Sequence, residues 1–156
     1  MQTVAAEAHC KLPPRECWEK LRDFGAASNY VPGVTHIEFV GEQREGVGAC
    51  RIAHSKAMSI HETVTEWTEG KGFVIRLHKG EGPPSPMKEA TFRYAIEPAG
   101  SSESDGTRIV LTMSFAFGLG PLGAVIGRIA RGAMQKNLDA IAPRLAQYWE
   151  TGEPVE

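Results

Sequence analysis

The sequence predicts an α+β fold in which a seven-stranded antiparallel sheet curls around one long C-terminal helix. Three observations support this prediction. Seven short segments alternate apolar and polar residues with a period of two, as half-buried strands do. The connections between most of them are short and rich in Gly, Pro, Ser and Asp, which is typical of an antiparallel meander. The C-terminal segment instead carries apolar residues at spacings of three and four, as an amphipathic helix does.

The expected strands are interrupted once, near the N-terminus. The first strand stops at Pro13-Pro14, which suits the first turn of a short helix over residues 14–22. A second short helical or turn segment is expected over residues 25–30, before Pro32-Gly33 ends it. The segments expected to be strands are residues 2–12, 34–42, 47–54, 58–68, 72–79, 87–97 and 107–117.

The closing helix is expected over residues 121–151, with Pro121 in its first turn and Gly152 at its end. Pro143 lies inside this range and predicts a kink, or a break one turn earlier. Small residues crowd the first half of the helix: Gly120, Gly123, Ala124, Gly127, Ala130 and Gly132. They allow either close backbone packing or a void beside the sheet. Since one helix is too narrow to cover seven strands, we expect a cavity between helix and sheet.

The composition excludes several classes of protein. Of 156 residues, 42% are hydrophobic and 23% charged, which predicts a packed core in one domain over residues 1–156. A formal net charge of −2 argues against nucleic acid or an anionic membrane as the main partner. The three cysteines form no CxxC motif and indicate free thiols, so a cytoplasmic location is expected. The uncharged stretch 109–127 fits a strand followed by a helix, and neither it nor the N-terminus predicts a membrane span or signal peptide.

Six segments of the chain resemble the START-like (SRPBCC) superfamily, and in detail its bacterial proteins described as polyketide cyclase/dehydrase. The segments are Trp18-Glu-Lys-Leu-Arg-Asp-Phe24, Tyr30-Val-Pro-Gly-Val34, Gly46-Val-Gly-Ala-Cys-Arg51, Ile60-His-Glu-Thr-Val-Thr-Glu-Trp67, Gly120-Pro-Leu-Gly123 and Tyr148-Trp-Glu-Thr-Gly152. The resemblance extends over nearly the whole chain and implies a helix-grip fold. It constrains function less, because the superfamily holds lipid carriers, hormone receptors and aromatase/cyclases.

Glu62 is the first candidate site residue, because it shares a strand face with the apolar Ile60 and Val64. A buried carboxylate needs a partner or water, so Glu62 either points into a cavity or is paired in the core. The resemblance implies that a Glu at this position faces the cavity and contacts ligand through water.

The preceding strand leaves two alternatives open. Cys50, Ile52 and His54 share one face, and their apolar content favours that face as the inward one. The resemblance instead implies that Arg51 lies inward, near the bottom of the pocket, where it could pair with Glu62 or hold an acidic head group. For Arg51 and His54 alike, a solvated surface role is the competing interpretation.

Tyr94 is a further candidate, since its hydroxyl could donate a hydrogen bond to a ligand from an apolar strand face. The expected apolar wall of the cavity consists of Ile60, Val64, Ile75, Leu77, Phe92, Ile96, Leu111, Met113, Phe115, Val125, Ile129 and Met134. Residues 55–57 and 80–86 are expected to lie at one end of the meander and to rim the cavity. No histidine pair has metal-ligand spacing on one strand or helix, and no nucleotide or hydrolase motif is present, so neither a metal nor a cofactor is expected.

These observations favour a protein that binds a hydrophobic or amphipathic small molecule, such as a lipid, an aromatic or a polyketide-like compound. The first alternative is a polyketide aromatase/cyclase or dehydratase of the same fold, which needs a general acid or base near a bound polyketone. The sequence offers no evident catalytic dyad, so an enzyme is the less favoured interpretation. The second alternative is an accessory interaction module for a membrane-associated enzyme, as resembling superfamily members provide.

Overall fold

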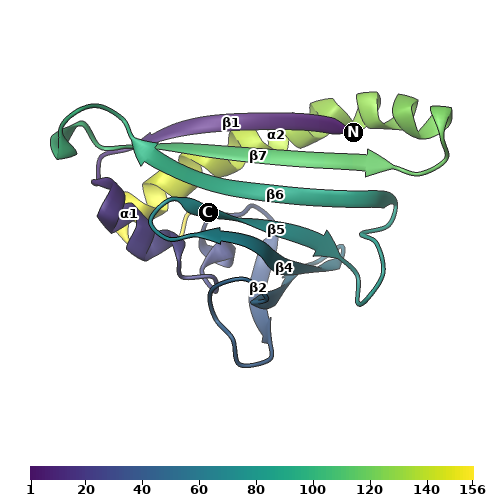
Figure 1. The fold of residues 1–156 in the computed structure, drawn as a ribbon, viewed down its shortest axis with the longest axis horizontal. Helices are drawn as coiled ribbons and strands as arrows, with labels where there is room; N and C mark the ends of the chain where they lie inside the picture. The colour runs from purple at the N-terminus through teal and green to yellow at the C-terminus, as the bar shows by residue number, and fades with distance from the viewer.

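The computed structural model describes residues 1–156. Its elements in chain order are β1 (Gln2–Cys10), α1 (Pro14–Leu21), the 3-10 helix η1 (Ala27–Asn29), β2 (Val34–Val40), β3 (Cys50–Ser55), β4 (Ser59–Thr68), β5 (Gly72–His78), β6 (Met87–Pro98), the 3-10 helix η2 (Glu103–Asp105), β7 (Thr107–Phe117) and α2 (Pro121–Thr151). The predicted α+β fold is confirmed: seven antiparallel strands form one sheet, in the order β1-β7-β6-β5-β4-β3-β2, and curl around a long C-terminal helix (Figure 1).

The meander places the connections at two ends of the molecule. Residues 56–58, 79–86 and 118–120 join β3 to β4, β5 to β6 and β7 to α2, and all three lie at the same end of the sheet, the right-hand end in Figure 1. The expected positions of the two loops therefore agree with the structure. The helix α1 lies at the other end, beside the end of β6 (Figure 1).

The long helix α2 packs mainly on β1 and β7, so it covers only the part of the sheet that these two strands form. Of the two alternatives predicted at Pro143, a kink or a break one turn earlier, the break does not occur, because the helix is continuous from Pro121 to Thr151. Its second half carries the large buried side chains Leu138, Leu145 and Trp149 into the core. No helix of the structure combines the length and apolar character that crossing a membrane requires.

The first half of α2 is held against the strand ends by small residues. Gly123 and Gly127 are buried one turn apart, and a Cβ atom at Gly123 would lie 1.8 Å from the carbonyl oxygen of Gly118. Of the two alternatives for these small residues, a void or close backbone packing, the structure shows close packing here. The helix therefore sits too close to the end of β7 for a wide cavity at this position.

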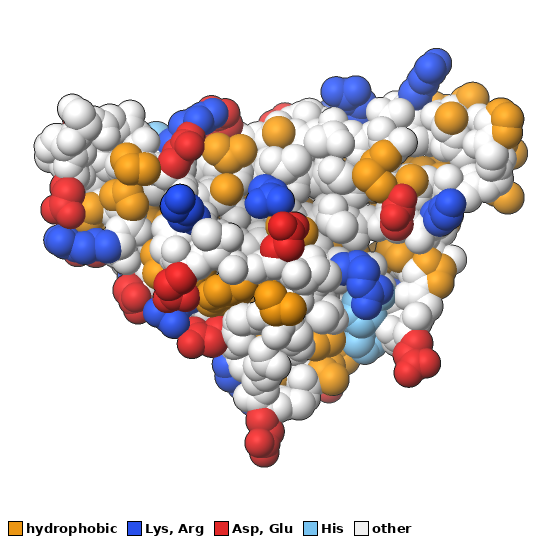
Figure 2. Space-filling view, in the orientation of Figure 1, with side chains coloured by type: hydrophobic (Ala, Val, Ile, Leu, Met, Phe, Trp, Pro, Cys, Tyr) orange, Lys and Arg blue, Asp and Glu red, His pale blue; other side chains and the backbone are white.

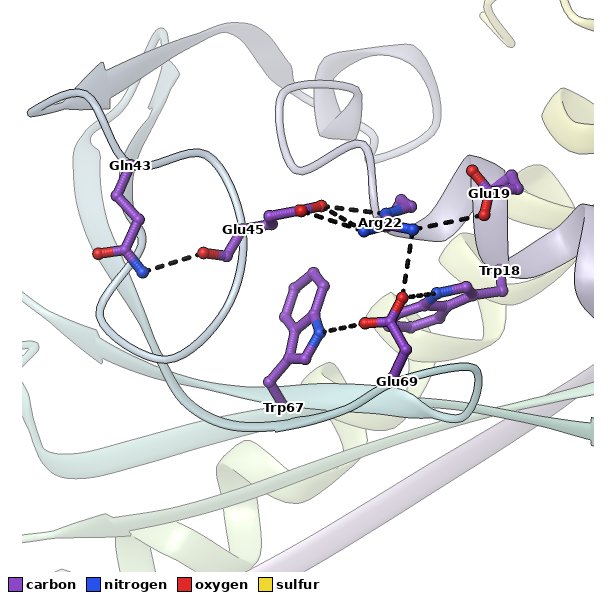
Figure 3. Close-up of polar contacts among 7 residues, drawn as sticks. All are labelled: Trp18, Glu19, Arg22, Gln43, Glu45, Trp67 and Glu69. Carbon is purple, nitrogen blue, oxygen red and sulfur yellow. Dashed lines mark hydrogen bonds and ion pairs between the residues drawn. The ribbon is translucent and has the colours of Figure 1, made fainter.

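A shared carboxylate fastens α1 to the turn between β4 and β5 (Figure 3). Glu69 accepts the indole N–H of Trp18 at 3.0 Å and that of Trp67 at 2.9 Å, and it lies 3.2 Å from Arg22 Nη1. Arg22 in turn binds both carboxylate oxygens of Glu45 in the β2–β3 connection. The indole N–H of the buried Trp18 needs an acceptor, and the same carboxylate also accepts from the half-buried Trp67, so Glu69 holds the two rings together.

We predict that Gly123→Ala destabilises the protein by about 2–3 kcal/mol, because a methyl group there forces backbone apart. The matched variant is Gly132→Ala in the same helix, where a Cβ meets nothing within 4 Å. It should be neutral or stabilising by up to about 1 kcal/mol, through helix propensity. Urea unfolding of both variants measures the difference, and equal stabilities would contradict the close packing of α2 on the strand ends.

The Glu69 carboxylate should also make stability depend on pH. The hydrogen bond from Trp67, and then that from Trp18, lower the pKa of Glu69 below its ordinary value of 4.5. A lowered pKa means that its stabilisation is present above pH 4.5 and is lost as the pH falls through the folded-state pKa. In Glu69→Gln an NH2 donor replaces one of the two carboxylate oxygens that accept the indole N–H groups, so this variant should be less stable than wild type at neutral pH. The difference in unfolding free energy between wild type and Glu69→Gln should become smaller as the pH falls.

Urea midpoints measured from neutral to acid pH test this expectation, with Glu42→Gln in the exposed β2–β3 connection as the matched charge change. A gap between wild type and Glu69→Gln that stays constant below pH 4.5 would be inconsistent with it.

Candidate functional site

The side chain of Arg51 lies on the concave, helix-facing side of the sheet, and this resolves the two alternatives for β3. Arg51 and Ala53 are buried, whereas Cys50, Ile52 and His54 are half-buried on the opposite, outer face. The apolar content of Cys50 and Ile52 therefore pointed to the wrong face, and the position implied by the family resemblance is the observed one. His54 consequently does not reach the interior.

Arg51 is held by three contacts to two residues. Its Nε donates to Glu62 Oε2 at 2.5 Å, across the directly paired positions of β3 and β4. Its Nη1 donates to the carbonyl oxygen of Phe24 at 2.7 Å, and its guanidinium stacks 4.1 Å above the Phe24 ring. Burial, the largest single influence, acts to lower the pKa of Arg51, but Glu62 and the neighbouring Tyr94 and Tyr30 together raise it, so the guanidinium stays charged.

Two buried tyrosines complete this polar cluster. Tyr94 on β6 and Tyr30 after η1 are both nearly inaccessible to solvent. Burial raises the pKa of Tyr94 against the opposing charge of Arg51, and it raises the pKa of Tyr30 well above its ordinary value. Both hydroxyls therefore stay protonated and remain hydrogen-bond donors. We call Arg51, Glu62, Tyr30 and Tyr94 the interior polar cluster.

Burial along the concave face changes from one end to the other. Near α1 and η1, Val64, Phe73 and Ile75 are fully buried, while toward the β5–β6 connection the apolar side chains are only half-buried. We call this half-buried region the open end. Its apolar residues are Ile60, Leu77, Met87 and Phe117 from the sheet, with Ala130 and Met134 from α2. Glu62 lies on β4 between the half-buried Ile60 and the buried Val64, and so between the two regions. Its side chain is 14% exposed, whereas that of Arg51 is 2% exposed.

Most of the expected wall residues lie in or beside this region. Val64, Ile75, Phe92, Ile96, Leu111, Met113 and Phe115 are buried on the concave side, and Ile60, Leu77 and Met134 belong to the open end. Two are placed elsewhere: Val125 and Ile129 are 52% and 76% exposed, on the outer side of α2. The physical reason is the pair Gly123 and Gly127, which occupy the strand-facing side of the helix and turn the larger residues to solvent.

The depression between β7 and the start of α2 is small, about 200 Å³, and includes Phe115, Phe117, Gly123 and Gly127 in its lining. Wider depressions lie away from the concave face. One of about 730 Å³ is lined largely by charged residues of α1 and by the last turn of α2. The broad cavity expected beside the first half of α2 is thus replaced by close packing there, and Glu62 of the interior polar cluster borders the open end instead.

Sequence reasoning did not single out two members of this arrangement, Phe24 and Tyr30. Both come from the segment between α1 and β2, which carries no regular periodicity. The signal that existed was positional, because both residues belong to segments that resemble the START-like superfamily. Only the folded chain brings the Phe24 carbonyl and ring to Arg51.

Solved structures of other proteins share this fold over nearly the whole chain. A protein from Nitrosospira multiformis is 15% identical, with a TM-score of 0.74 over 97% of this chain and 98% of that chain. A protein from Thermus thermophilus is 20% identical, with a TM-score of 0.68 over 95% and 97%. The di-domain ARO/CYC protein BexL of the BE-7585A biosynthetic pathway is 13% identical, with a TM-score of 0.70 over 95% of this chain and 47% of that chain. At these identities the likeness is one of fold.

A search of curated proteins finds no match. The family model described as "Polyketide cyclase / dehydrase and lipid transport" matches residues 1–150. That match spans β1 through nearly all of α2, and together with the helix-grip architecture it confirms the resemblance seen in the sequence. The chain belongs to the polyketide cyclase / dehydrase and lipid transport family.

Proposed function

We propose that this protein binds an amphipathic small molecule, apolar along most of its length and polar at one end, at the open end of the concave face. The observation that carries the proposal is the interior polar cluster at the inner limit of a half-buried apolar surface. Buried charge in an apolar setting is costly and is found disproportionately at functional sites. Family membership supports the same conclusion.

The two parts of the proposed site have different roles. Ile60, Leu77, Met87 and Met134 offer apolar area that a ligand would remove from water, at about 25 cal/mol per Å². The protonated hydroxyl of Tyr94 supplies a donor for a ligand oxygen. The part-exposed Glu62 carboxylate can accept hydrogen bonds from water or a ligand hydroxyl, while its contact with Arg51 orients it.

Catalysis of a cyclisation or dehydration is the second candidate, favoured by the family's description and by the fold shared with BexL. In such a reaction the protonated Tyr94 is the available acid and Glu62 the available base. Incubation with a linear polyketone thioester, followed by mass spectrometry, tests it. An aromatic or dehydrated product that disappears in Glu62→Gln would establish catalysis, and unchanged substrate would leave binding as the function.

Filling the open end should block binding. We predict that Leu77→Trp lowers the affinity for anilinonaphthalene sulfonate, an amphipathic fluorescent probe, by at least about tenfold, because the indole occupies the space the probe needs. The matched control is Ile129→Trp on the exposed outer side of α2, which should bind as wild type does. Fluorescence titration measures both. Equal affinity in the two variants would place the probe outside the open end and refute the proposed site.

The Tyr94 hydroxyl should contribute to recognition of the polar end. Tyr94→Phe is expected to weaken binding of a fatty-acid probe, laurate, by at least about tenfold, the effect of losing one hydrogen bond to a charged carboxylate of about 1.5–3 kcal/mol. Tyr148→Phe is the control, since that hydroxyl accepts a hydrogen bond from Asn29 outside the interior polar cluster. Competition against anilinonaphthalene sulfonate gives the affinities, and a loss of the same size in both variants would contradict a specific role for Tyr94.

A further inference from the structure

The outer face of β2 and β3 carries a second group of polar residues, separate from the interior polar cluster. His36 pairs directly with His54 across the two strands, and Glu38 lies two residues further along β2 on the same face. A register shift between Val34 and His36 precedes this pair. Such bulges turn side chains locally and are over-represented beside functional sites. On the face of the molecule shown in Figure 2, acidic and basic side chains are interspersed and some histidine atoms reach the surface.

These three side chains converge on one point. One ligand atom from each of His36, Glu38 and His54 lies within 4.8 Å of the other two. The imidazole rings stack with centroids 4.6 Å apart, and His54 Nε2 lies 2.9 Å from Glu38 Oε1. Small side-chain rotations bring three such atoms to the spacing that bonds of about 2.0–2.2 Å to one ion require.

The second nitrogen of His54 is also held. Its Nδ1 lies 2.6 Å from the hydroxyl oxygen of Ser59, the residue paired with His54 on β4. Metal-binding histidines usually engage their other ring nitrogen in this way, because the contact fixes the ring orientation. The contact leaves Nε2 of His54 facing Glu38 and His36.

We propose that His36, Glu38 and His54 form a binding site for a divalent transition-metal ion, with Zn²⁺ as the ion of choice for the test. Two imidazoles and one carboxylate are a donor set that Zn²⁺ and similar ions prefer, and three protein ligands leave a position for water. Because β2 is the edge strand of the sheet, the bound ion would tie that edge to β3. Without an ion, the only direct polar contact among these three side chains is the one between His54 Nε2 and Glu38 Oε1.

The sequence spacing gave no indication of this site, because its two histidines come from different strands. Neither strand carries a histidine pair, and the cluster exists only through the β2–β3 register. The site is independent of the proposed small-molecule function, since it lies on the opposite face of the sheet from Arg51 and Glu62.

Isothermal titration of tag-free, chelator-treated full chain with Zn²⁺ tests the proposal. We expect one ion per chain, and a loss of affinity of at least about tenfold in both His36→Ala and His54→Ala. His36 is exposed, so its substitution leaves the fold intact. His61→Ala is the matched control, because His61 lies on the same outer face but outside the cluster, and its affinity should equal that of wild type.

Thermal unfolding gives a second readout, since an ion that binds the folded chain raises its melting temperature. Wild type and His61→Ala should gain stability on addition of Zn²⁺, and His36→Ala should gain none. Co²⁺ should give visible absorption bands in the same two proteins that respond to Zn²⁺. No binding of Zn²⁺ by wild type, or equal binding by all four proteins, would overturn the site.

Discussion

The width of the sheet relative to the single long helix governs the rest of this structure. Seven strands present one continuous concave face, and α2 covers the part formed by β1 and β7. The remaining strands must be covered by something else. The segment of α1 and η1 does this at one end through Phe24 and Tyr30, and nothing of comparable size covers the other end. The division into a packed end and an open end follows from this unequal coverage.

The Arg51–Glu62 pair is costly in such a setting, and its cost bears on its role. A buried ion pair adds little net stability over a well-packed apolar pair, whereas removal of one partner alone is strongly destabilising. Stability alone therefore does not account for placing a guanidinium against the Phe24 ring and carbonyl. A polar group at a defined depth in an apolar face does what apolar packing cannot, because it distinguishes one end of a ligand from the other.

Much of the fold followed from the sequence, because period-two alternation and breaker residues report strand number and order directly. The site was less accessible. Alternation left the inward face of β3 open, and apolar content favoured the wrong one, since the outer face also carries the apolar residues Cys50 and Ile52, which are half-buried. Helical spacing wrongly predicted that Val125 lines the cavity wall, whereas its side chain is exposed. Spacing identifies an apolar stripe, but it does not show which side of a glycine-rich helix packs against the sheet. Cross-strand clusters such as His36 and His54 depend on register, which no local pattern encodes.

The edge strand β2 links the two faces of the sheet. Its outer side carries His36 and Glu38, while its inner side carries Phe39, whose ring lies 6.3 Å from that of Phe24. Phe24 in turn supplies the carbonyl oxygen and the ring that hold Arg51. An edge strand has one neighbour instead of two, so side-chain contacts determine its position more than they do for a central strand. Whatever restrains β2 against β3 on the outer face therefore also restrains Phe39, and through Phe24 it restrains the guanidinium at the inner limit of the open end.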